Sequence, residues 1–327
     1  MSRGTVSRVL NGGRNVRPAM LDKVNAAIDA LGYSVNQAAR NLARGRTGSI
    51  AFVISDREER LFEDPNFGLF ARVFSRELRK TGRHLLITTA QGEQEENFLG
   101  DYLTLGHVDG ALLALTHEEE PLLGRLLPYR LPLVVLGKPL GFEDAFSWVA
   151  IDDAKAACTL VSYLAARVSA RVTARVNGPI GTVTGPLHTS SGRERLDGCR
   201  RALGDRFRPD LVAAGDWSLS SGHRGAADLL AREPGLRGLF VASDLMAVGA
   251  IGALREAGRR VPDDVAVAGF DNSAAATMVE PALTTMRNPI EQTALEALRI
   301  LDNQIAGRVR RPVHLLLSSE LVERGTC

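Results

Sequence analysis

Short acidic and hydroxyl side chains recur directly after apolar runs in this chain. The polar pairs in these places are Ser55 and Asp56, Asp152 and Asp153, Ser243 and Asp244, and Asp271 and Asn272. Carboxylate and hydroxyl oxygens accept hydrogen bonds from the hydroxyl groups of a ligand. A single such pair indicates no more than the N-cap of a helix. Several pairs converging on one crevice would instead favour a site for a sugar or a related polyol.

Arg195 and Trp217 would complement a site of this kind. Arg195, within "SSGRERLDGC", carries a planar fork of hydrogen-bond donors. Trp217, within "GDWSLSSG", carries a flat apolar face against which a ring can stack. The two side chains add a donor and a stacking surface to the acceptors that follow the apolar runs.

Motifs for catalysis are missing from the sequence. It contains no GxGxxG, GxxxxGK(S/T), HExxH or GxSxG, and its six histidines are scattered. The carboxylate pairs Asp152–Asp153 and Asp263–Asp264 stand at strand-to-helix junctions, where capping or solvation is the simpler role. The three cysteines lack CxxC spacing, which predicts neither a disulfide framework nor a metal cluster. We therefore expect no enzyme, no cofactor and no metal site.

The segment "SRGTVSRVLNGGRNVRP", residues 2–18, has the composition of a helix that contacts DNA. Arg3, Thr5, Ser7 and Arg8 are spaced so that a helix would turn them toward one groove. The first 47 residues contain eight basic and two acidic side chains, a net charge of +6, whereas the whole chain carries +2. Because the excess of positive charge is local, this part of the chain favours contact with nucleic acid.

Eight apolar runs alternate with helix-length segments after residue 48. They are "SIAFVIS", "RHLLITT", "GALLAL", "LPLVVLG", "SWVAI", "IGTVTG", "GLFVAS" and "VAVAGF". Runs of Val, Ile and Leu that are apolar on both faces indicate parallel strands covered by helices. We expect two sets of four strands, and hence an α/β fold with two doubly wound parallel-sheet subdomains. Ligands of such sheets bind outside the carboxyl ends of the strands, where the polar pairs stand.

Two helical stretches are expected before this core. Residues 18–33 repeat apolar side chains at helical spacing, with Pro18 in the first turn and Gly32 as a stop. Residues 36–48 have a helical composition and a basic end, which is typical of a linker that folds when it is held. No apolar run approaches the roughly 18 residues of a membrane span, and arginines interrupt the place of a signal peptide. We therefore expect a cytoplasmic protein.

The order of these parts resembles the LacI/GalR family of bacterial transcriptional regulators over essentially the whole chain. The matching pieces are, in order, "TVSRVLNG", "LGY", "NQAARNLARG", "DPNF", "GPLHTSSGRERLDG", "GDWS", "ASDLMAVGAIGALREAGRRVPDDVAVAGFDN", "PALTTMRNP" and "LVERGT". No single piece is decisive. Their collinearity makes the resemblance specific.

The resemblance implies a homodimer with DNA-reading headpieces and a core similar to periplasmic sugar-binding proteins. It implies a partial helix-turn-helix headpiece in residues 1–35, a hinge helix in residues 36–47, and an effector-binding and dimerisation core in residues 48–327. The expected subdomains of the core comprise residues 48–148 with 286–308, and residues 149–285 with 309–327. Operator DNA and a sugar-like effector are the implied partners, without a membrane. Whether the effector induces or corepresses stays open, because both use the same cleft.

In the headpiece, the resemblance implies that the helix over residues 2–10 enters the major groove. Arg3 and Arg8 would face base edges. Side chains toward the phosphates would be Ser2, Thr5, Ser7, Asn11 and Asn15. Gly4 stands where the family usually has a second specificity side chain, so base readout is expected to be weaker or to depend on DNA shape.

In the linker, the resemblance implies a hinge helix that pairs with its twin in the minor groove. Leu42 falls at the position whose apolar side chain wedges into a base step and bends the duplex. Asn36, Ala39 and Ala43 would allow the close approach of helix and groove. From periodicity alone, Leu42 is more simply a core contact against the headpiece.

In the core, Asp271, Arg195 and Asp244 fall on the effector-binding positions of the family. The full set of predicted effector-binding residues is Ser55, Asp56, Phe67, Asp152, Arg195, Trp217, Ser243, Asp244 and Asp271. Phe67 and Trp217 are the expected stacking surfaces. Ser243 replaces the asparagine that commonly precedes the aspartate, so the effector is expected to differ from simple galactosides or glucosides.

The headpiece of this family needs a first helix of the form D-V-A-x-x-A-G-V-S. Only Met1 precedes Ser2, in the place of the valine of Gly-Val-Ser. Since a start codon can read as valine internally, we expect the natural chain to begin further upstream. The main alternative is a ligand-binding module that has lost DNA binding by truncation. A periplasmic binding protein and an enzyme are weaker alternatives.

Overall fold

The computed structural model describes most of the chain and divides it into two units. The described residues are 5–6, 9, 16–31, 46–56, 58–114, 117–118, 120–171 and 178–327. The first unit comprises residues 1–48 and the second comprises residues 49–327. Each unit is taken by itself below.

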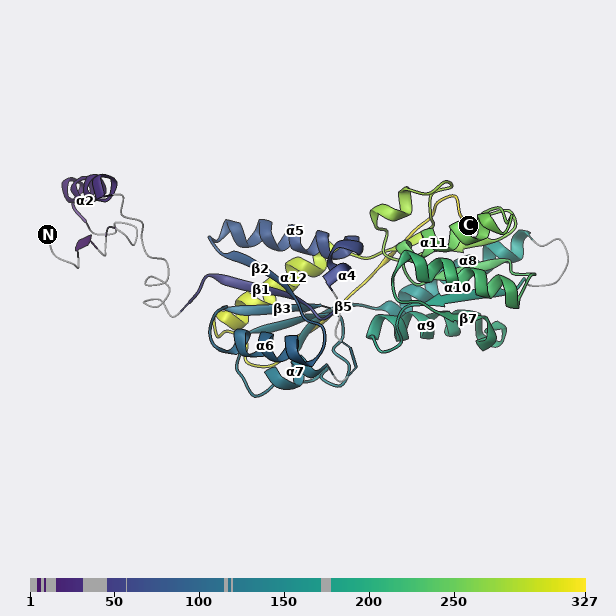
Figure 1. Ribbon diagram of the computed structural model, residues 1–327, viewed down its shortest axis with the longest axis horizontal. Helices are drawn as coiled ribbons and strands as arrows, with labels where there is room; N and C mark the ends of the chain where they lie inside the picture. The colour runs from purple at the N-terminus through teal and green to yellow at the C-terminus, as the bar shows by residue number, and fades with distance from the viewer. Residues whose placement is uncertain are drawn as a thin grey trace. The chain divides into compact units, whose positions relative to one another are not determined.

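The first unit contains helix α2, Pro18–Leu31 (Figure 1). Proline suits the first turn because its missing N–H would have no partner there. Val24 is buried at 2% exposure, and Leu21 and Ile28, three and four residues away, are half-buried. The helix predicted from the apolar spacing is therefore confirmed.

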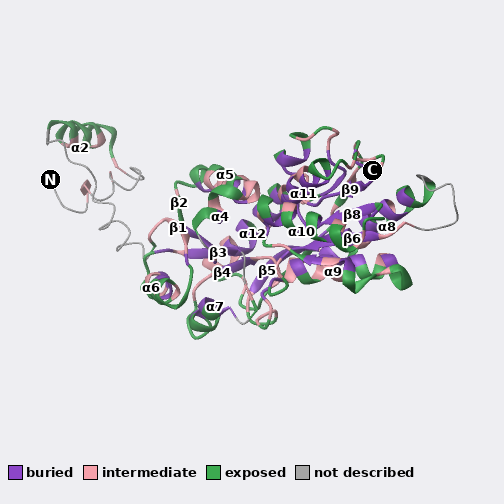
Figure 2. Cartoon of the chain, turned by 45° about the vertical axis from the view of Figure 1, so that its right-hand side comes forward, coloured by how far each residue is buried: buried purple, intermediate pink, exposed green. Residues whose placement is uncertain are grey.

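The second unit begins with a six-stranded parallel sheet. Its strand order is β11-β5-β4-β3-β1-β2. The strands are β1 Ser49–Ile54, β2 His84–Thr89, β3 Gly110–Ala114, β4 Leu133–Leu136, β5 Ser147–Ile151 and β11 His314–Leu317. Buried strands fill the interior of this subdomain (Figure 2). Sequences that are apolar on both faces form such strands because helices cover the sheet on both sides.

Within the described residues, five helices belong to this first subdomain. They are α4 Glu58–Glu63, α5 Pro65–Lys80, α6 Glu93–Thr104, α7 Pro121–Leu126 and α12 Ile290–Ile305. Helices α5 and α12 pack on one face of the sheet, where Phe52, Phe70 and Phe74 form an aromatic cluster. Helices α6 and α7 pack on the other face. The segment α4–α5 follows β1 and so begins at the carboxyl end of the sheet.

The second subdomain is a four-stranded parallel sheet of order β7-β6-β8-β9. The strands are β6 Ile180–Thr184, β7 Val212–Ala214, β8 Gly238–Val241 and β9 Ala266–Ala268. The helices are α8 Asp153–Arg171, α9 Ser190–Leu203, α10 Leu219–Arg232 and α11 Asp244–Glu256. Helices α8 and α9 pack against each other on one face of the sheet, and α10 and α11 do so on the other.

Short elements complete the second subdomain and link it to the first. Strands β10 Thr285–Arg287 and β12 Glu320–Val322 form an antiparallel pair. Three short 3-10 helices span Gly204–Arg206, Pro209–Leu211 and Ala274–Thr277. The chain passes between the subdomains after β5, between β10 and α12, and between β11 and β12. In the described part of the chain, no helix has the length and apolarity to cross a bilayer.

The α/β fold with two doubly wound parallel subdomains is confirmed, whereas the expected division of strands is wrong. Strand β5, "SWVAI", pairs with β4 of the first sheet and does not open the second. Strand β11 also joins the first sheet, so residues 309–317 belong to the first subdomain. The second sheet instead gains β7, whose three residues are too short to stand out as an apolar run. Composition identifies a buried strand but not the sheet in which it pairs.

Candidate ligand-binding site

A cavity lies between the two subdomains of the second unit. About 910 Å³ of space in it is free of protein atoms, and part of that space is open to solvent. The first subdomain contributes α4, α5, α12 and the carboxyl ends of β3, β4 and β5. The second contributes the starts of α8 and α9 and the residues that follow β8 and β9. The cavity therefore stands where parallel sheets bind their ligands.

Arg195 forms the centre of the wall contributed by the second subdomain. It lies on α9, whose N-cap Thr189 accepts a hydrogen bond from the backbone N–H of Gly192. The side chain is only 5% exposed. Its Nε donates to Asp153 Oδ1 at 2.7 Å, and its Nη1 donates to the carbonyl of Ala242 at 2.6 Å. Two hydrogen bonds and an ionic partner fix the guanidinium plane.

Aromatic rings enclose the same guanidinium. Its carbon lies 3.7 Å from the centroid of Phe270 and 5.5 Å from that of Trp217. Trp217 has a positive φ of 69°, and its ring lies over Gly185 so closely that a Cβ there would be 2.0 Å from it. The indole Nε1 is buried without a hydrogen-bond partner. Trp217 thus presents both an apolar face and an unused donor at the cavity.

Asp271 carries an acceptor into the cavity from the segment after β9. Its φ is 110°, and the backbone is held because its N–H donates to Met286 and its carbonyl accepts from Asn288. One carboxylate oxygen lies 3.5 Å from Nη1 of Arg195. Burial raises the pKa of Asp271 to about 8, since desolvation outweighs the nearby cation and the charge of Asp244 adds to it. Burial likewise raises the pKa of Asp153.

The wall contributed by the first subdomain comes from α4 and α5. Arg60 is 1% exposed, and its Nη2 donates to Asp64 Oδ2 at 3.0 Å. Asp64 is also the N-cap of α5, where it accepts from the N–H of Asn66. Arg60, Asp64, Asn66 and Phe67 all line the cavity. An N-capped helix start thereby places a cation, an acid, an amide and a ring on one surface.

Five of the nine predicted effector-binding residues line the cavity. They are Phe67, Arg195, Trp217, Ser243 and Asp271. Ser243 is in addition the N-cap of α11, where its side chain accepts from the N–H of Met246. The segments chosen from strand ends and from the aromatic residues therefore do meet in one crevice.

The other four predicted residues lie off the cavity. Ser55 donates to Glu120 at 2.9 Å, and Asp56 lies 3.6 Å from Nε of Arg60. Asp152 accepts from the N–H of Lys155 in the first turn of α8. Asp152 therefore caps a helix, which is the simpler of the two roles considered for it, whereas its neighbour Asp153 lines the cavity.

Asp244 is buried beneath the wall. Its carboxylate accepts from the N–H of Ser273 at 2.7 Å and from Oγ1 of Thr285 at 2.6 Å. Burial raises its pKa to about 6, although both hydrogen bonds oppose the rise. These bonds tie the start of α11 to the segment that carries Asp271, so the position of Asp244 supports the site from behind.

Several cavity residues were not found from the sequence. They include Arg60, Asp64, Asn66, Thr189 and Asn288. Most stand within or at the start of a helix and not directly after a strand, so the strand-end rule passes over them. The N-cap pattern Asp64-Pro65 before an amphipathic helix was the available signal, because it marks a helix start close to the carboxyl end of β1.

The predicted DNA-contacting residues fall almost wholly outside the described residues. Thr5 is described, and it is helical and half-buried. The ones outside are Ser2, Arg3, Ser7, Arg8, Asn11, Asn15, Asn36, Ala39, Leu42 and Ala43. Their roles stay predictions.

Comparison with known proteins identifies the family. Residues 1–36 match the family of bacterial regulatory proteins called lacI, and residues 179–327 match a periplasmic binding protein-like domain. The chain is 37% identical to the HTH-type transcriptional regulator CelR of Thermobifida fusca over 99% of this chain and 94% of CelR. This protein belongs to the lacI family of bacterial regulatory proteins. The HTH-type transcriptional repressor PurR of Escherichia fergusonii is 30% identical over 99% and 93% of the two chains.

Solved structures of lacI-family proteins have the same fold. A transcriptional regulator CelR–cellobiose complex is 36% identical, with a TM-score of 0.80 over 100% of this chain and 96% of the other. The lac repressor dimer bound to operator and the anti-inducer ONPF has a TM-score of 0.83 over 100% of this chain and 95% of the repressor chain. Because the two sequences are only 22% identical, this likeness is evidence for a shared fold and for nothing more.

Membership of the lacI family confirms the prediction that this chain is a DNA-binding transcriptional regulator controlled by a small effector. The relatives CelR and PurR are both transcriptional regulators. Among the residues that the structure describes, no group of three or more His, Cys, Asp or Glu side chains is placed to hold a metal ion.

Proposed function

We propose that the cavity binds a neutral disaccharide of the cellobiose type and that its occupancy controls binding of the chain to operator DNA. One observation carries the proposal: Arg195, held by Asp153, stands beside Trp217 and Asp271 in a cavity shared by both subdomains. Rings that stack on apolar faces and hydroxyl groups that meet carboxylates are the usual partners of such a wall. The CelR relative, with its cellobiose complex, supports the same ligand class.

The five cavity-lining residues predicted from the sequence contact the sugar in this proposal. Asp271 and Ser243 accept or donate hydrogen bonds to hydroxyl groups, Arg195 donates, and Phe67 and Trp217 stack. The four residues off the cavity hold the wall in place. Ser55 and Asp56 do so in the first subdomain, and Asp152 and Asp244 in the second.

A sugar that contacts both walls couples the cavity to DNA. It binds more tightly when the two subdomains adopt one relative placement, so it shifts the population toward that placement. In a homodimer the shift moves the two first subdomains and with them the hinge segments, residues 36–47. Arg3 and Arg8 then read base edges only in the state that places both headpieces, residues 1–35, on one operator in the cytoplasm.

Titration calorimetry with cellobiose tests the ligand, with sucrose as the control disaccharide. We expect one saturable site per chain for cellobiose and no measurable heat for sucrose. A flat cellobiose titration would overturn the assignment of ligand class.

A second measurement tests the coupling to DNA. Duplexes selected by the chain from a random library should bind with an affinity that falls steeply with salt, because phosphate contacts release counterions. Cellobiose should change that affinity by about tenfold or more, within the usual range of allosteric coupling. Equal affinities with and without cellobiose would contradict the coupling.

A further inference from the structure

Helix α4 buries a charge in the cavity wall. Arg60 is the largest of the fully buried side chains in the described part of the chain, although it lies in a helix of six residues. Arginine is rarely buried to this degree unless its donors are used. Because Arg60 is buried and lines the cavity, we expect its guanidinium donors to have hydrogen-bond acceptors there.

Protein atoms use only part of the Arg60 guanidinium. Nη2 donates to Asp64 at 3.0 Å. Nε lies 3.6 Å from Asp56, which is too far for a hydrogen bond, and both Nε and Nη1 are buried without a hydrogen-bond partner. Buried donors in native proteins are nearly always paired, and an unpaired one at a binding cavity points to a ligand acceptor.

The two walls of the cavity carry matching arginine–carboxylate pairs. Arg60 with Asp64 stands on the first subdomain, and Arg195 with Asp153 and Asp271 stands on the second. The charge of Asp64 contributes to the raised pKa of Asp271, so these two carboxylates lie within electrostatic reach of each other across the cavity. Each wall also has its own aromatic surface, Phe67 on the first and Trp217 on the second.

We propose that Arg60, oriented by Asp64, binds the second ring of a neutral disaccharide and so makes the effector site selective for a disaccharide over a monosaccharide. The inference rests on the proposed function. One sugar ring occupies the wall of Arg195 and Trp217. The other ring occupies the wall of Arg60 and Phe67, where its hydroxyl oxygens accept from Nε and Nη1.

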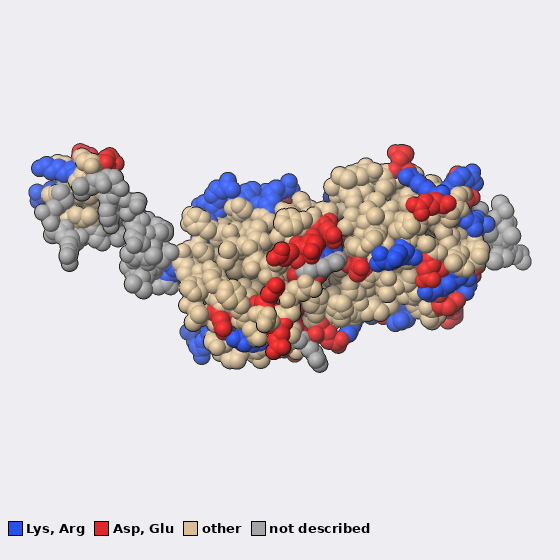
Figure 3. All heavy atoms as spheres, in the orientation of Figure 1, with Lys and Arg blue, Asp and Glu red and all other residues tan. Residues whose placement is uncertain are grey.

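The charges on the cavity favour a neutral ligand over an anion. The charged side chains among its described lining residues are three carboxylates and two guanidinium groups. Exposed Glu58, Glu59 and Glu63 add negative charge on α4, where Figure 3 shows acidic side chains gathered. With Asp271 protonated near neutral pH, the two other carboxylates balance the two guanidinium groups, so a sugar acid or sugar phosphate would find no excess of positive charge in the cavity and would be repelled by the glutamates of α4.

Calorimetry on Arg60→Met and Arg60→Lys, with cellobiose, glucose and cellobionate as probes, tests the inference. The unchanged chain should bind cellobiose at least about tenfold more tightly than glucose or cellobionate. Arg60→Met should lose about tenfold or more in cellobiose affinity, as expected for lost charge-assisted hydrogen bonds, and should bind cellobiose and glucose about equally. Arg60→Lys, which keeps the cation but not the fork, should lose most of the same affinity.

Arg76→Met is the matched control. Arg76 lies on α5 of the same subdomain and pairs with Glu77 and Glu291, but it is exposed and does not line the cavity. It should leave cellobiose binding unchanged, and thermal melting of all variants shows whether each is folded.

The outcomes separate three failures. Cellobiose affinities of folded Arg60→Met or Arg60→Lys within about twofold of the unchanged chain would overturn the role of Arg60 alone. Glucose or cellobionate binding as tightly as cellobiose to the unchanged chain would overturn the selectivity. No binding of any of the three sugars would overturn the proposed function and this inference with it.

Discussion

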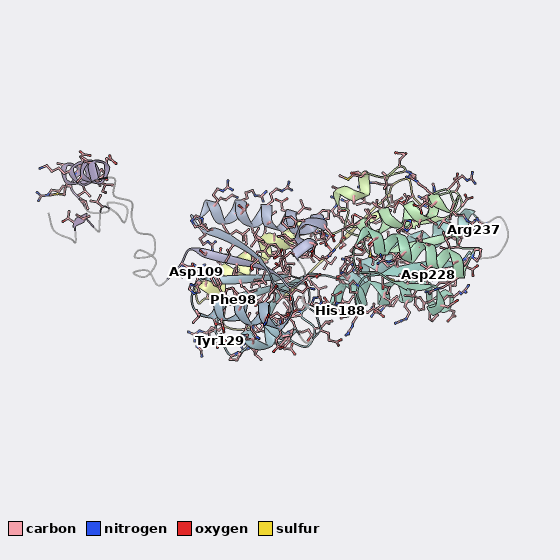
Figure 4. The ribbon with its side chains drawn as sticks, viewed as in Figure 1. Phe98, Asp109, Tyr129, His188, Asp228 and Arg237 are labelled. Carbon is pink, nitrogen blue, oxygen red and sulfur yellow. The ribbon has the colours of Figure 1, made fainter. Side chains whose placement is uncertain are left out.

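Arg193 on α9 forms a two-pronged ion pair with Glu118, which follows strand β3. Nη1 donates to Oε1 at 3.0 Å, and Nη2 donates to Oε2. The pair joins the two subdomains. Beside it, the N–H of Glu118 donates to the carbonyl of His188 at 2.8 Å, and the rings of His117 and His188 lie 4.7 Å apart. Figure 4 shows His188 at the boundary between the subdomains, next to Thr189, which lines the cavity.

This cross-subdomain contact should favour the arrangement that encloses a ligand. We expect Glu118→Gln to lower cellobiose affinity roughly threefold, because an exposed ion pair is weak and this one can form only when the two subdomains lie close together. The free energy of unfolding should change little. Calorimetry and urea denaturation give the two quantities.

The charge-swapped variant, Glu118→Arg with Arg193→Glu, is the control for this effect. It should recover most of the affinity, since the opposite charges still meet across the boundary. If the charge-swapped variant binds cellobiose as weakly as Glu118→Gln, the ion pair does not contribute to closure of the subdomains.

The raised pKa of Asp271 predicts a pH dependence of stability. Its pKa is about 8 in the folded chain, against an ordinary value of 3.8. Between these values the folded chain holds a proton that the unfolded chain has lost, so the free energy of unfolding should fall as pH rises. The slope from this group is at most about 1.4 kcal/mol per pH unit.

Urea denaturation of Asp271→Asn at pH 5, 6 and 7 provides the measurement. The amide cannot titrate, so the variant should be flatter in pH than the unchanged chain. Gly68→Ala, a substitution on α5 that meets no atom within 4 Å and removes no titratable group, should keep the original slope. If the free energy of unfolding changes with pH equally in the unchanged chain and in Asp271→Asn, another group is responsible for the pH dependence.

Gly185 should be essential for the position of Trp217. A Cβ at residue 185 would lie 2.0 Å from the indole ring, so Gly185→Ala must displace the ring or the strand end. We expect a loss of about 1–3 kcal/mol in stability, the range for overpacked sites, together with weaker cellobiose binding. Gly68→Ala on α5 meets no atom within 4 Å and should be neutral or slightly stabilising.

Tryptophan fluorescence can follow this change directly. The sequence has two tryptophans, Trp148 and Trp217. In a Trp148→Phe background the emission reports Trp217 alone, and cellobiose should alter it in the Gly185 form more than in the Gly185→Ala form. If cellobiose changes the emission equally in the two forms, the position of the Trp217 ring does not affect its contact with the ligand.

Arg195→Lys should be damaging although it keeps the charge. Lysine cannot reproduce the donor fork that reaches Asp153 and the carbonyl of Ala242, nor the stacking on Phe270. Because a buried acid would then be poorly paired, we expect a loss of about 3 kcal/mol in stability and at least tenfold in cellobiose affinity. Denaturation with and without cellobiose measures both effects, and an unchanged midpoint shift by cellobiose would contradict the role of Arg195.

Apolar runs and cap residues were enough to predict the class of fold. Buried parallel strands need Val, Ile and Leu on both faces, and "SIAFVIS" and "VAVAGF" meet that need locally. Composition could not assign β5 to its sheet, because an apolar run does not specify its neighbours: β5 pairs with β4 on one side and, through Trp148 and His314, with β11 on the other, more than 160 residues away. The pairing with β11 depends on the return of the chain to the first subdomain between β10 and α12.

The sequence by itself determined the family, the two-subdomain α/β fold and the strand ends at which polar side chains gather, because local composition and order encode these features. Only the tertiary structure decided which polar groups face the cavity. Asp152 and Asp153 are adjacent in sequence, yet one caps α8 and the other holds Arg195. Arg60 looks like an ordinary surface residue of a short charged helix until the packing of α4 buries it. Burial and unmet hydrogen bonds arise from residues far apart in the chain, so they become visible only once the chain is folded.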